Sequence, residues 1–208
     1  MALLWTNSAL KACLEGLGST PKFALLNGTR TGGATTQSSA VVTLTSTTGL
    51  AVGMLCEHAN IPAGTRITVV DNSTTLTLSA NATVTNTGLT FIFSVGPRSV
   101  YMSEVVGLEI STTGYTGAHG GSGRKALTPS YSKTDSANTA MIDCSDPTWT
   151  GIGVEAGVPV THIVVHIPGT SNDTDALIVG SYPWAQTLYG GNATVNIAAT
   201  GLGTIAQV

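Results

Sequence analysis

Hydrophobic and polar residues alternate along much of this chain with the period of two that is typical of half-buried β-strands. The alternation is most regular within residues 36–95, where the runs VVTLT, RITVV, TTLTLS and LTFIFS follow one another closely. Short segments rich in Asn, Asp, Thr and Gly, such as VDNST and NTG, separate these runs and predict tight turns. We therefore predict that residues 36–95 form a compact β module of their own.

A second and looser β pattern fills the rest of the chain. The run KFALLNG predicts a buried strand over Phe23–Leu26, which then leads into the glycine-rich turn TRTGG. Further on, VPVTHIVVHIPG, DALIVGSYPW and NATVNIAATG are short apolar runs bounded by Gly, Pro or Asn, as in β-sandwiches. Because KFALL finds no partner strand inside the module, we predict one discontinuous β-sandwich domain from residues 1–35 and 96–208. Residues 36–95 would then be an insertion in one of its loops.

The beginning of the chain, MALLWTNSALKACLEGLG, has a helical pattern instead. Leu10 and Leu14 lie one helical turn apart, Asn7 or Ser8 suits an N-cap, and glycine follows. We predict a short amphipathic helix, and we leave two interpretations of it open: Trp5 at its start caps a core, or Trp5 and the helix contact another copy of the chain. The segment lacks the basic start and long apolar core of a signal peptide. No apolar run in the chain approaches the roughly 20 residues that a membrane span needs, so we expect no membrane association.

Composition narrows the functional classes. Charged residues make up 9% of the 208-residue chain, against roughly 25% in an average soluble protein. The polar share comes from Thr, Ser, Asn and 25 glycines, a composition typical of strands and turns. The formal net charge is −3, and the eight Lys and Arg residues are scattered. Nucleic-acid binding needs clustered basic residues, so we expect no direct nucleic-acid contact.

Cys56, Glu57 and His58 are the only place where a cysteine, a carboxylate and a histidine adjoin. A tetrahedral metal site needs four ligands, and the module has no further Cys or His. A histidine two residues along a strand is also poorly placed to activate the thiol. We therefore interpret the triplet as the end of a strand, followed by a loop and a Pro-Ala-Gly turn. With Cys13 and Cys144 the chain has three widely spaced cysteines, which predict reduced thiols rather than a disulfide framework.

Three further motifs favour structural interpretations over binding sites. His162 and His166 in THIVVHIP lie on one face of a predicted strand, which we expect to point outward or toward another subunit. GAHGGSGRK lacks the spacing and the following helix of a phosphate loop, so we interpret it as a flexible loop. Asp173 and Asp175 in SNDTDAL lack the glycine and distal glutamate of a calcium loop, and a hairpin turn explains them better.

The aromatic residues leave two interpretations open. Trp149, Trp184 and Tyr189 would suit a sugar-stacking surface, but such residues more often fill a core or an interface. No catalytic motif emerges from the sequence, so we predict that the protein is not an enzyme, with no catalytic, cofactor-binding or metal-binding residues. The candidate interface residues are Trp5, Leu10, Leu14, Trp184 and Tyr189.

The second half of the chain resembles a family of small structural proteins of tailed bacteriophages, comprising decoration and other head or tail accessory proteins. The resemblance rests on YMSEVVGLEISTTGYTGAHGGSGRKAL, TAMIDCSDPTWTG, VTHIVVHIPGTSNDTDALIVGSY and GGNATVNIAATGLGTI, together with the earlier KFALLNG. The sequence departs from the family at AHGGSGRK, where the family turn is shorter, and at SYPWAQTLY, which ends differently. The inserted segment, with TTGLAVGML, IPAGTRITVVDNSTTLTLSANAT and LTFIF, resembles a small β unit that recurs in phage tail, fibre and decoration proteins.

This resemblance implies a virion component with no catalytic residues. We expect a capsid decoration (cement) protein that binds the head surface and stabilises it, with one domain on the shell and the inserted module projecting. Its expected partners are the major capsid protein and copies of itself, in a homo-oligomer for which a trimer is one option. The expected location is the virion surface, after assembly in the host cytoplasm. The alternative is a tail, neck, baseplate or fibre accessory protein, including a sugar-binding host-attachment module.

Overall fold

The computed structural model describes residues 21–96, 99, 101–126, 129–134, 139–144, 146–152, 157–189, 193–194 and 203–206. The predicted N-terminal helix, with Trp5, Leu10 and Leu14, lies outside these residues. The fold is mainly β, as predicted, and within the described ranges its helices are two short 3-10 turns, η1 (Met102–Glu104) and η2 (Val106–Leu108). Neither has the length or hydropathy to cross a bilayer.

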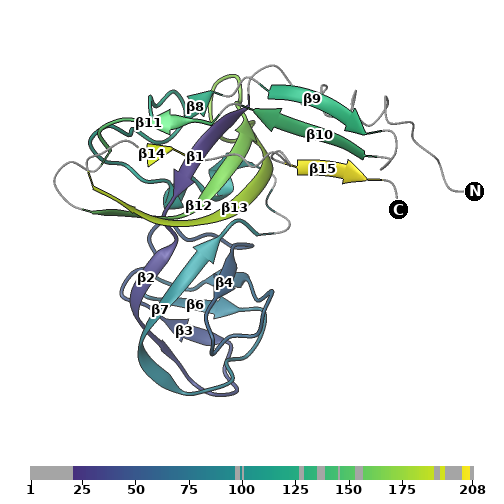
Figure 1. The fold of residues 1–208 in the computed structure, drawn as a ribbon. Coiled ribbons are helices and arrows are strands. Elements are labelled where there is room, and N and C mark those ends of the chain that lie inside the picture. Colours follow the sequence, from purple (N-terminus) through teal and green to yellow (C-terminus); the bar gives the residue numbers. More distant parts are fainter. Residues whose placement is uncertain are drawn as a thin grey trace, which may run out of the picture.

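Six antiparallel strands form a barrel-like module, which lies below the other sheets in Figure 1. They are β2 (Thr29–Thr35), β3 (Val41–Thr43), β4 (Leu55–Glu57), β5 (Ile67–Val70), β6 (Thr75–Leu78) and β7 (Asn86–Ser94). Their order is β4-β7-β2-β3-β6-β5. The two outer strands meet, because the Cys56 N–H donates to the Thr65 carbonyl and the Ile67 N–H to the Met54 carbonyl, both at 2.9 Å. This closure leaves the module little free strand edge.

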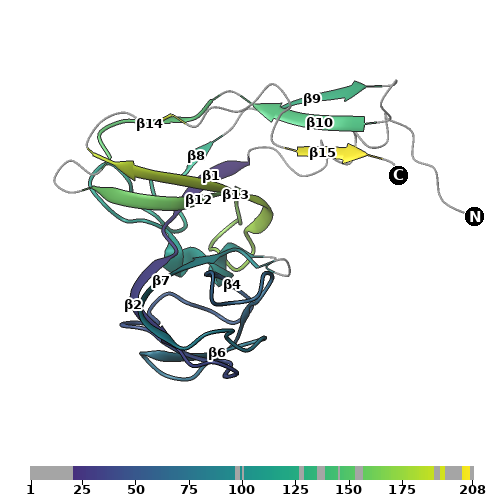
Figure 2. The same cartoon turned by 60° about the horizontal axis from the view of Figure 1, so that its bottom comes forward.

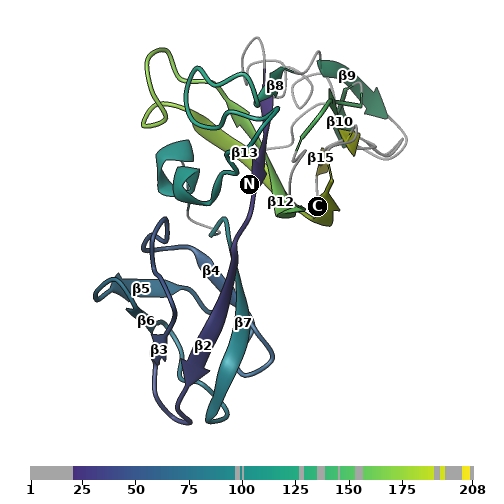
Figure 3. The same ribbon diagram turned by 90° about the vertical axis from the view of Figure 1, so that its left-hand side faces the viewer.

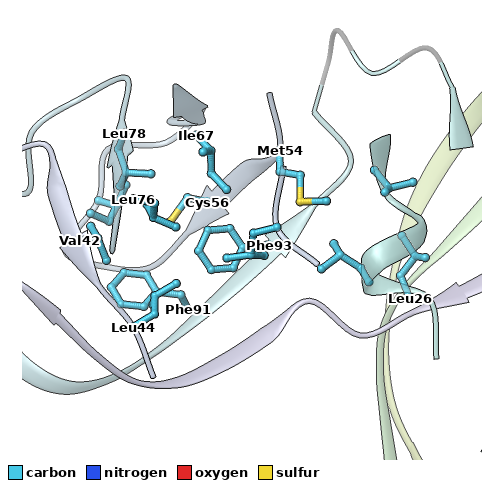
Figure 4. Packing of buried hydrophobic residues seen from close by; sticks show 14 of the residues in the cluster. Leu26, Val42, Leu44, Met54, Cys56, Ile67, Leu76, Leu78, Phe91 and Phe93 are labelled. Carbon is cyan, nitrogen blue, oxygen red and sulfur yellow. The ribbon is translucent and has the colours of Figure 1, made fainter. Parts of the chain in front are cut away.

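The interior of the barrel is filled by the hydrophobic half of the alternating pattern. Phe91 and Phe93 on β7 are fully buried, with their ring centroids 6.4 Å apart. Burial of one such side chain stabilises a fold by about 1.5–3 kcal/mol. Around them lie Val42, Leu44, Met54, Cys56, Ile67, Leu76 and Leu78, as Figure 4 shows.

The glycine-rich segment TRTGG is part of strand β2, so the prediction of a turn there was wrong. β2 pairs with β7 and β3, and the six-stranded sheet therefore begins at Thr29 rather than at residue 36. Glycine usually weakens a strand, but here it creates space and bends the chain. A Cβ on Gly33 would lie 2.3 Å from the Phe91 ring, and the register shifts on both sides of Gly33.

The other large sheet has four antiparallel strands in the order β13-β12-β1-β8. They are β1 (Lys22–Leu26), β8 (Lys125–Ala126), β12 (Val158–Ile167) and β13 (Leu177–Leu188). The buried strand predicted at Phe23–Leu26 is thus confirmed as β1. Two smaller sheets lie beside it in Figure 1, to the upper right and upper left. They consist of β9 (Pro129–Thr134), β10 (Thr139–Cys144) and β15 (Gly203–Ala206), and of β11 (Thr148–Trp149) and β14 (Ala193–Thr194).

The barrel and the four-stranded sheet share one core. Met102 and Leu108 from the 3-10 turns pack in the same buried cluster as Leu26 of β1 and Met54 of the barrel. Figures 2 and 3 show these turns between the two parts. Two backbones also touch there: a Cβ on Gly49 would lie 2.2 Å from the Gly107 carbonyl oxygen. The barrel is therefore seated closely against the rest of the chain.

Candidate functional site

The Cys-Glu-His triplet lies at the end of strand β4, as predicted. Cys56 points into the barrel and is 2% exposed. Burial, and secondarily the charge of Glu57, raise the pKa of this thiol to about 12. A thiol with such a pKa is protonated near neutral pH, whereas nucleophilic attack and metal binding need the thiolate. Cys56 is therefore a core residue.

His58 organises the loop that follows β4. Its ring stacks on Phe91 with a centroid separation of 4.9 Å, and its Nδ1 accepts a hydrogen bond from the Asn60 N–H at 3.0 Å. Residues 55–58 and 61–64 line an open hollow of about 270 Å³ at this point. No three His, Cys, Asp or Glu side chains gather in a metal-binding arrangement anywhere in the described part of the chain.

A buried charge cluster joins three segments that are distant in sequence. The Arg124 guanidinium contacts Glu109 with Nη2–Oε2 at 2.6 Å, and Asp173 with Nη1–Oδ1 at 2.5 Å. The three side chains are only 3%, 2% and 11% exposed. Burial acts to lower the pKa of Arg124, but hydrogen bonds and charge from both carboxylates together raise it, so the guanidinium stays charged.

Tyr115 connects this cluster to the four-stranded sheet. Its hydroxyl donates to Glu109 Oε1 at 2.9 Å and accepts from the Leu25 N–H at 2.9 Å. Burial, followed by the nearby Glu109 charge, raises the pKa of Tyr115, which keeps its proton. Trp149 extends the network, since its indole N–H donates to the Gly123 carbonyl at 2.5 Å. The loop that contains GAHGGSGRK is thus fixed at its Arg124 end, contrary to the prediction of a flexible loop.

The cluster also fixes the connection between β12 and β13. Asp173 lies in this turn, and its carbonyl accepts the Ser103 N–H at 3.0 Å. Asp175 accepts the Thr170 hydroxyl at 2.7 Å. The prediction of a hairpin turn at Asp173 and Asp175 is confirmed, and the turn determines where β13 begins.

The prediction that His162 and His166 point outward or toward another subunit was wrong. They are 7% and 1% exposed, because β12 is an inner strand with both faces covered. His162 Nδ1 lies 3.1 Å from the Thr161 hydroxyl. Neither ring nitrogen of His166 has a hydrogen-bond partner within the described ranges. Burial, and then the positive charge of Arg124, lower the pKa of His166 to about 4.

Within the described residues, most of the exposed large apolar side chains outside the barrel lie on or just after β13, and a further one, Tyr101, pairs with Leu177 at the start of that strand. Leu177, Val179 and Tyr182 are 41%, 39% and 36% exposed, and Tyr189, just after the strand, is 76% exposed. Of the candidate interface residues, Trp184 is half-buried on β13 and Tyr189 projects beside Gly157. Trp149 is fully buried, so it offers no surface for stacking on a sugar.

Sequence reasoning did not find the Arg124 cluster. It weighed Arg124 as a phosphate ligand and Asp173 as a calcium ligand, each alone. The available signal was the scarcity of charge. With eight basic residues in 208, a buried arginine and the few acidic residues are candidates to pair with one another.

Comparison with protein-family models, with curated protein sequences and with solved structures found no match to this chain.

Proposed function

We propose that this protein is a non-enzymatic structural component of a tailed-bacteriophage virion, and that it decorates the capsid surface and stabilises the head. The observation that supports this best is the pairing of two unlike parts. One is a sheet whose outer strand, β13, exposes uncharged apolar side chains. The other is a barrel-like module with Thr-rich outward positions, seated against that sheet. The first part suits attachment and the second suits projection from a shell.

The reactive side chains are consistent with a structural role. The thiol of Cys56 and the two histidines of β12 are buried, and the Arg124 guanidinium is fully engaged with carboxylates. In this proposal the partners are the major capsid protein and further copies of the chain. Tyrosine and tryptophan carry much of the binding energy in protein interfaces, which makes Trp184 and Tyr189 the expected contact residues on the sheet.

Quantification of purified particles tests this proposal. A decoration protein is present in a copy number equal to that of the capsid protein or to a simple fraction of it. Particles that lack the protein should also lose their nucleic acid at a lower temperature than complete particles. A few copies per particle would assign the protein to the tail or neck, and its absence from particles would end the proposal.

A sugar-binding attachment module is the second candidate, favoured by the exposed ring of Tyr189. Tyr189→Ala and Trp184→Ala should then abolish adsorption to host cells while the fold is retained. Unchanged adsorption of both variants would remove this candidate.

A further inference from the structure

The hollow beside His58 is a concave site on the barrel, formed where the chain leaves β4 and returns toward β5. Its volume is about 270 Å³, slightly below the roughly 300 Å³ at which pockets for whole small molecules begin. Its apolar lining comes from Leu55, Ile61, Pro62 and Ala63. The size and the lining suit an apolar group of a few atoms rather than a large ligand.

Hydrogen bonds hold the loop around the hollow, so the site is formed before a ligand arrives. The Thr65 hydroxyl donates to the Pro62 carbonyl at 2.6 Å. Thr83 donates its N–H, at 2.9 Å, and its hydroxyl, at 3.1 Å, to the Asn60 carbonyl. A ligand that binds here does not have to order a flexible loop, a step that would weaken its affinity.

Two polar side chains at the hollow are available to a ligand. His58 Nδ1 accepts the Asn60 N–H, so in the neutral ring the proton lies on Nε2, which makes this nitrogen a donor. The Glu57 side chain is exposed, and its carboxylate is an acceptor. Neither Nε2 nor this carboxylate has a hydrogen-bond or ion-pair partner within the described part of the chain. The hollow therefore presents one donor, one acceptor and an apolar wall.

We propose that this hollow binds the acetamido group of an N-acetylated amino sugar. An acetamido group combines a methyl group, an N–H donor and a carbonyl acceptor within a few atoms. The methyl group packs against Ile61 and Pro62, the N–H donates to the Glu57 carboxylate, and the carbonyl oxygen accepts from His58 Nε2. Each of the three features of the hollow then has its counterpart in the ligand. This site lies on the barrel and does not depend on the head-stabilising role of the protein.

Other small groups match the hollow less well. A simple hexose has no methyl group for the apolar wall, and a cation would pair with Glu57 but would be repelled by the N–H of His58. An acetylated lysine carries the same acetamido group at the end of an apolar chain. Because the hollow is open, that chain would remain in water, whereas the hydroxyl groups of a sugar ring are well solvated there.

Titration of the full-length protein with N-acetylglucosamine, followed through the NMR signals of the backbone amides, tests the site. We expect saturable shifts centred on residues 55–64, with a dissociation constant on the order of 1 mM for so small a contact. Glucose, which lacks the acetamido group, should bind about tenfold more weakly or not at all. Glu57→Ala and His58→Phe should each weaken binding about five- to tenfold, the effect of losing one hydrogen bond. Phenylalanine at position 58 keeps a ring against Phe91, and His119→Phe, in an exposed loop, is the matched control that should bind normally.

A filled hollow provides a second test. Ala63→Phe, at an exposed position of the lining, should abolish the shifts while circular dichroism shows an unchanged fold. Equal binding of glucose would overturn the acetamido contact, and tighter binding of an acetyl-lysine peptide would overturn the assignment to a sugar. Absence of saturable shifts at 50 mM N-acetylglucosamine, or normal binding by both Glu57→Ala and Ala63→Phe, would overturn the site itself. Because these measurements use the isolated chain, their failure would leave the virion role to be judged by the particle experiment.

Discussion

Arg124 and Glu109 form a bidentate ion pair that is almost completely shielded from water, with Nε–Oε1 at 2.8 Å and Nη2–Oε2 at 2.6 Å. With Asp173 on its other side, the guanidinium joins the end of η2, the start of β8 and the turn before β13. Loss of any one member of this cluster would leave the remaining charges buried without a partner.

Arg124→Met should destabilise the protein strongly, since it leaves Glu109 and Asp173 buried without their counter-charge. Removal of one partner from a buried pair costs about 3–5 kcal/mol in the free energy of unfolding. Urea denaturation followed by circular dichroism measures this loss. Arg66→Met, at a half-exposed position on the barrel, is the matched control and should change stability by less than about 1 kcal/mol. Equal effects of the two variants would contradict a special role for the cluster.

Acid should destabilise the protein through His166. In the unfolded chain this histidine binds a proton near its ordinary pKa of 6.5, whereas burial lowers the pKa in the fold to about 4. Between these values the unfolded state holds more protons, so the free energy of unfolding falls as the pH falls from about 6.5 to about 4. The total loss is on the order of 3 kcal/mol.

His166→Leu should flatten this part of the stability profile, measured by urea denaturation at a series of pH values. His119→Leu, in an exposed loop, should leave the profile unchanged. A His166→Leu profile as steep as that of the natural chain would assign the acid sensitivity to other groups.

The mainly-β class and the strands with regular alternation were predictable from sequence, because period-two patterning reports directly on half-buried strands. β3, β5, β6 and β7 follow from it, whereas β1 was predicted from a short continuous apolar run. The prediction was wrong at β2, where Gly33 makes space for the Phe91 ring. It failed again at β12, where both faces are covered and alternation no longer distinguishes inside from outside.

The charge cluster could not be predicted from local sequence patterns, for a different reason. Glu109, Arg124 and Asp173 come from three loops, and only the packing of η2 against β1 and of the β12–β13 turn against η1 brings them together. No local pattern encodes that proximity. The exposure of β13 was likewise invisible, since its sequence is as apolar as that of the buried strand β12.

Gly107→Ala should loosen the contact between the barrel and the rest of the chain. A Cβ at Gly107 would lie 2.5 Å from Gly49 Cα, a backbone atom that has no freedom to rotate away. Overpacking of this kind costs about 1–3 kcal/mol. Thermal unfolding followed by circular dichroism should show a lower midpoint. Gly180→Ala is the control, because its Cβ would meet only the Tyr182 side chain, at 3.3 Å. If Gly180→Ala lowered the midpoint as much as Gly107→Ala, the result would argue against a specific contact at Gly49.

The Cys56 thiol should not react with thiol reagents in the native protein. Its pKa of about 12 keeps the thiol protonated at pH 8, and the barrel interior excludes reagents as well. In a chain with Cys13→Ser and Cys144→Ser, a thiol-reactive chromogenic disulfide should therefore react several orders of magnitude more slowly than with free cysteine. Addition of urea above the unfolding midpoint should restore the normal rate.

In the absence of urea, reaction of Cys56 requires opening of the barrel. Phe93→Ala creates a cavity that lowers the free energy of unfolding by about 3–5 kcal/mol, so it should accelerate the reaction. Rapid native labelling would instead mean that Cys56 is accessible through the hollow beside His58, and that the triplet deserves a chemical role.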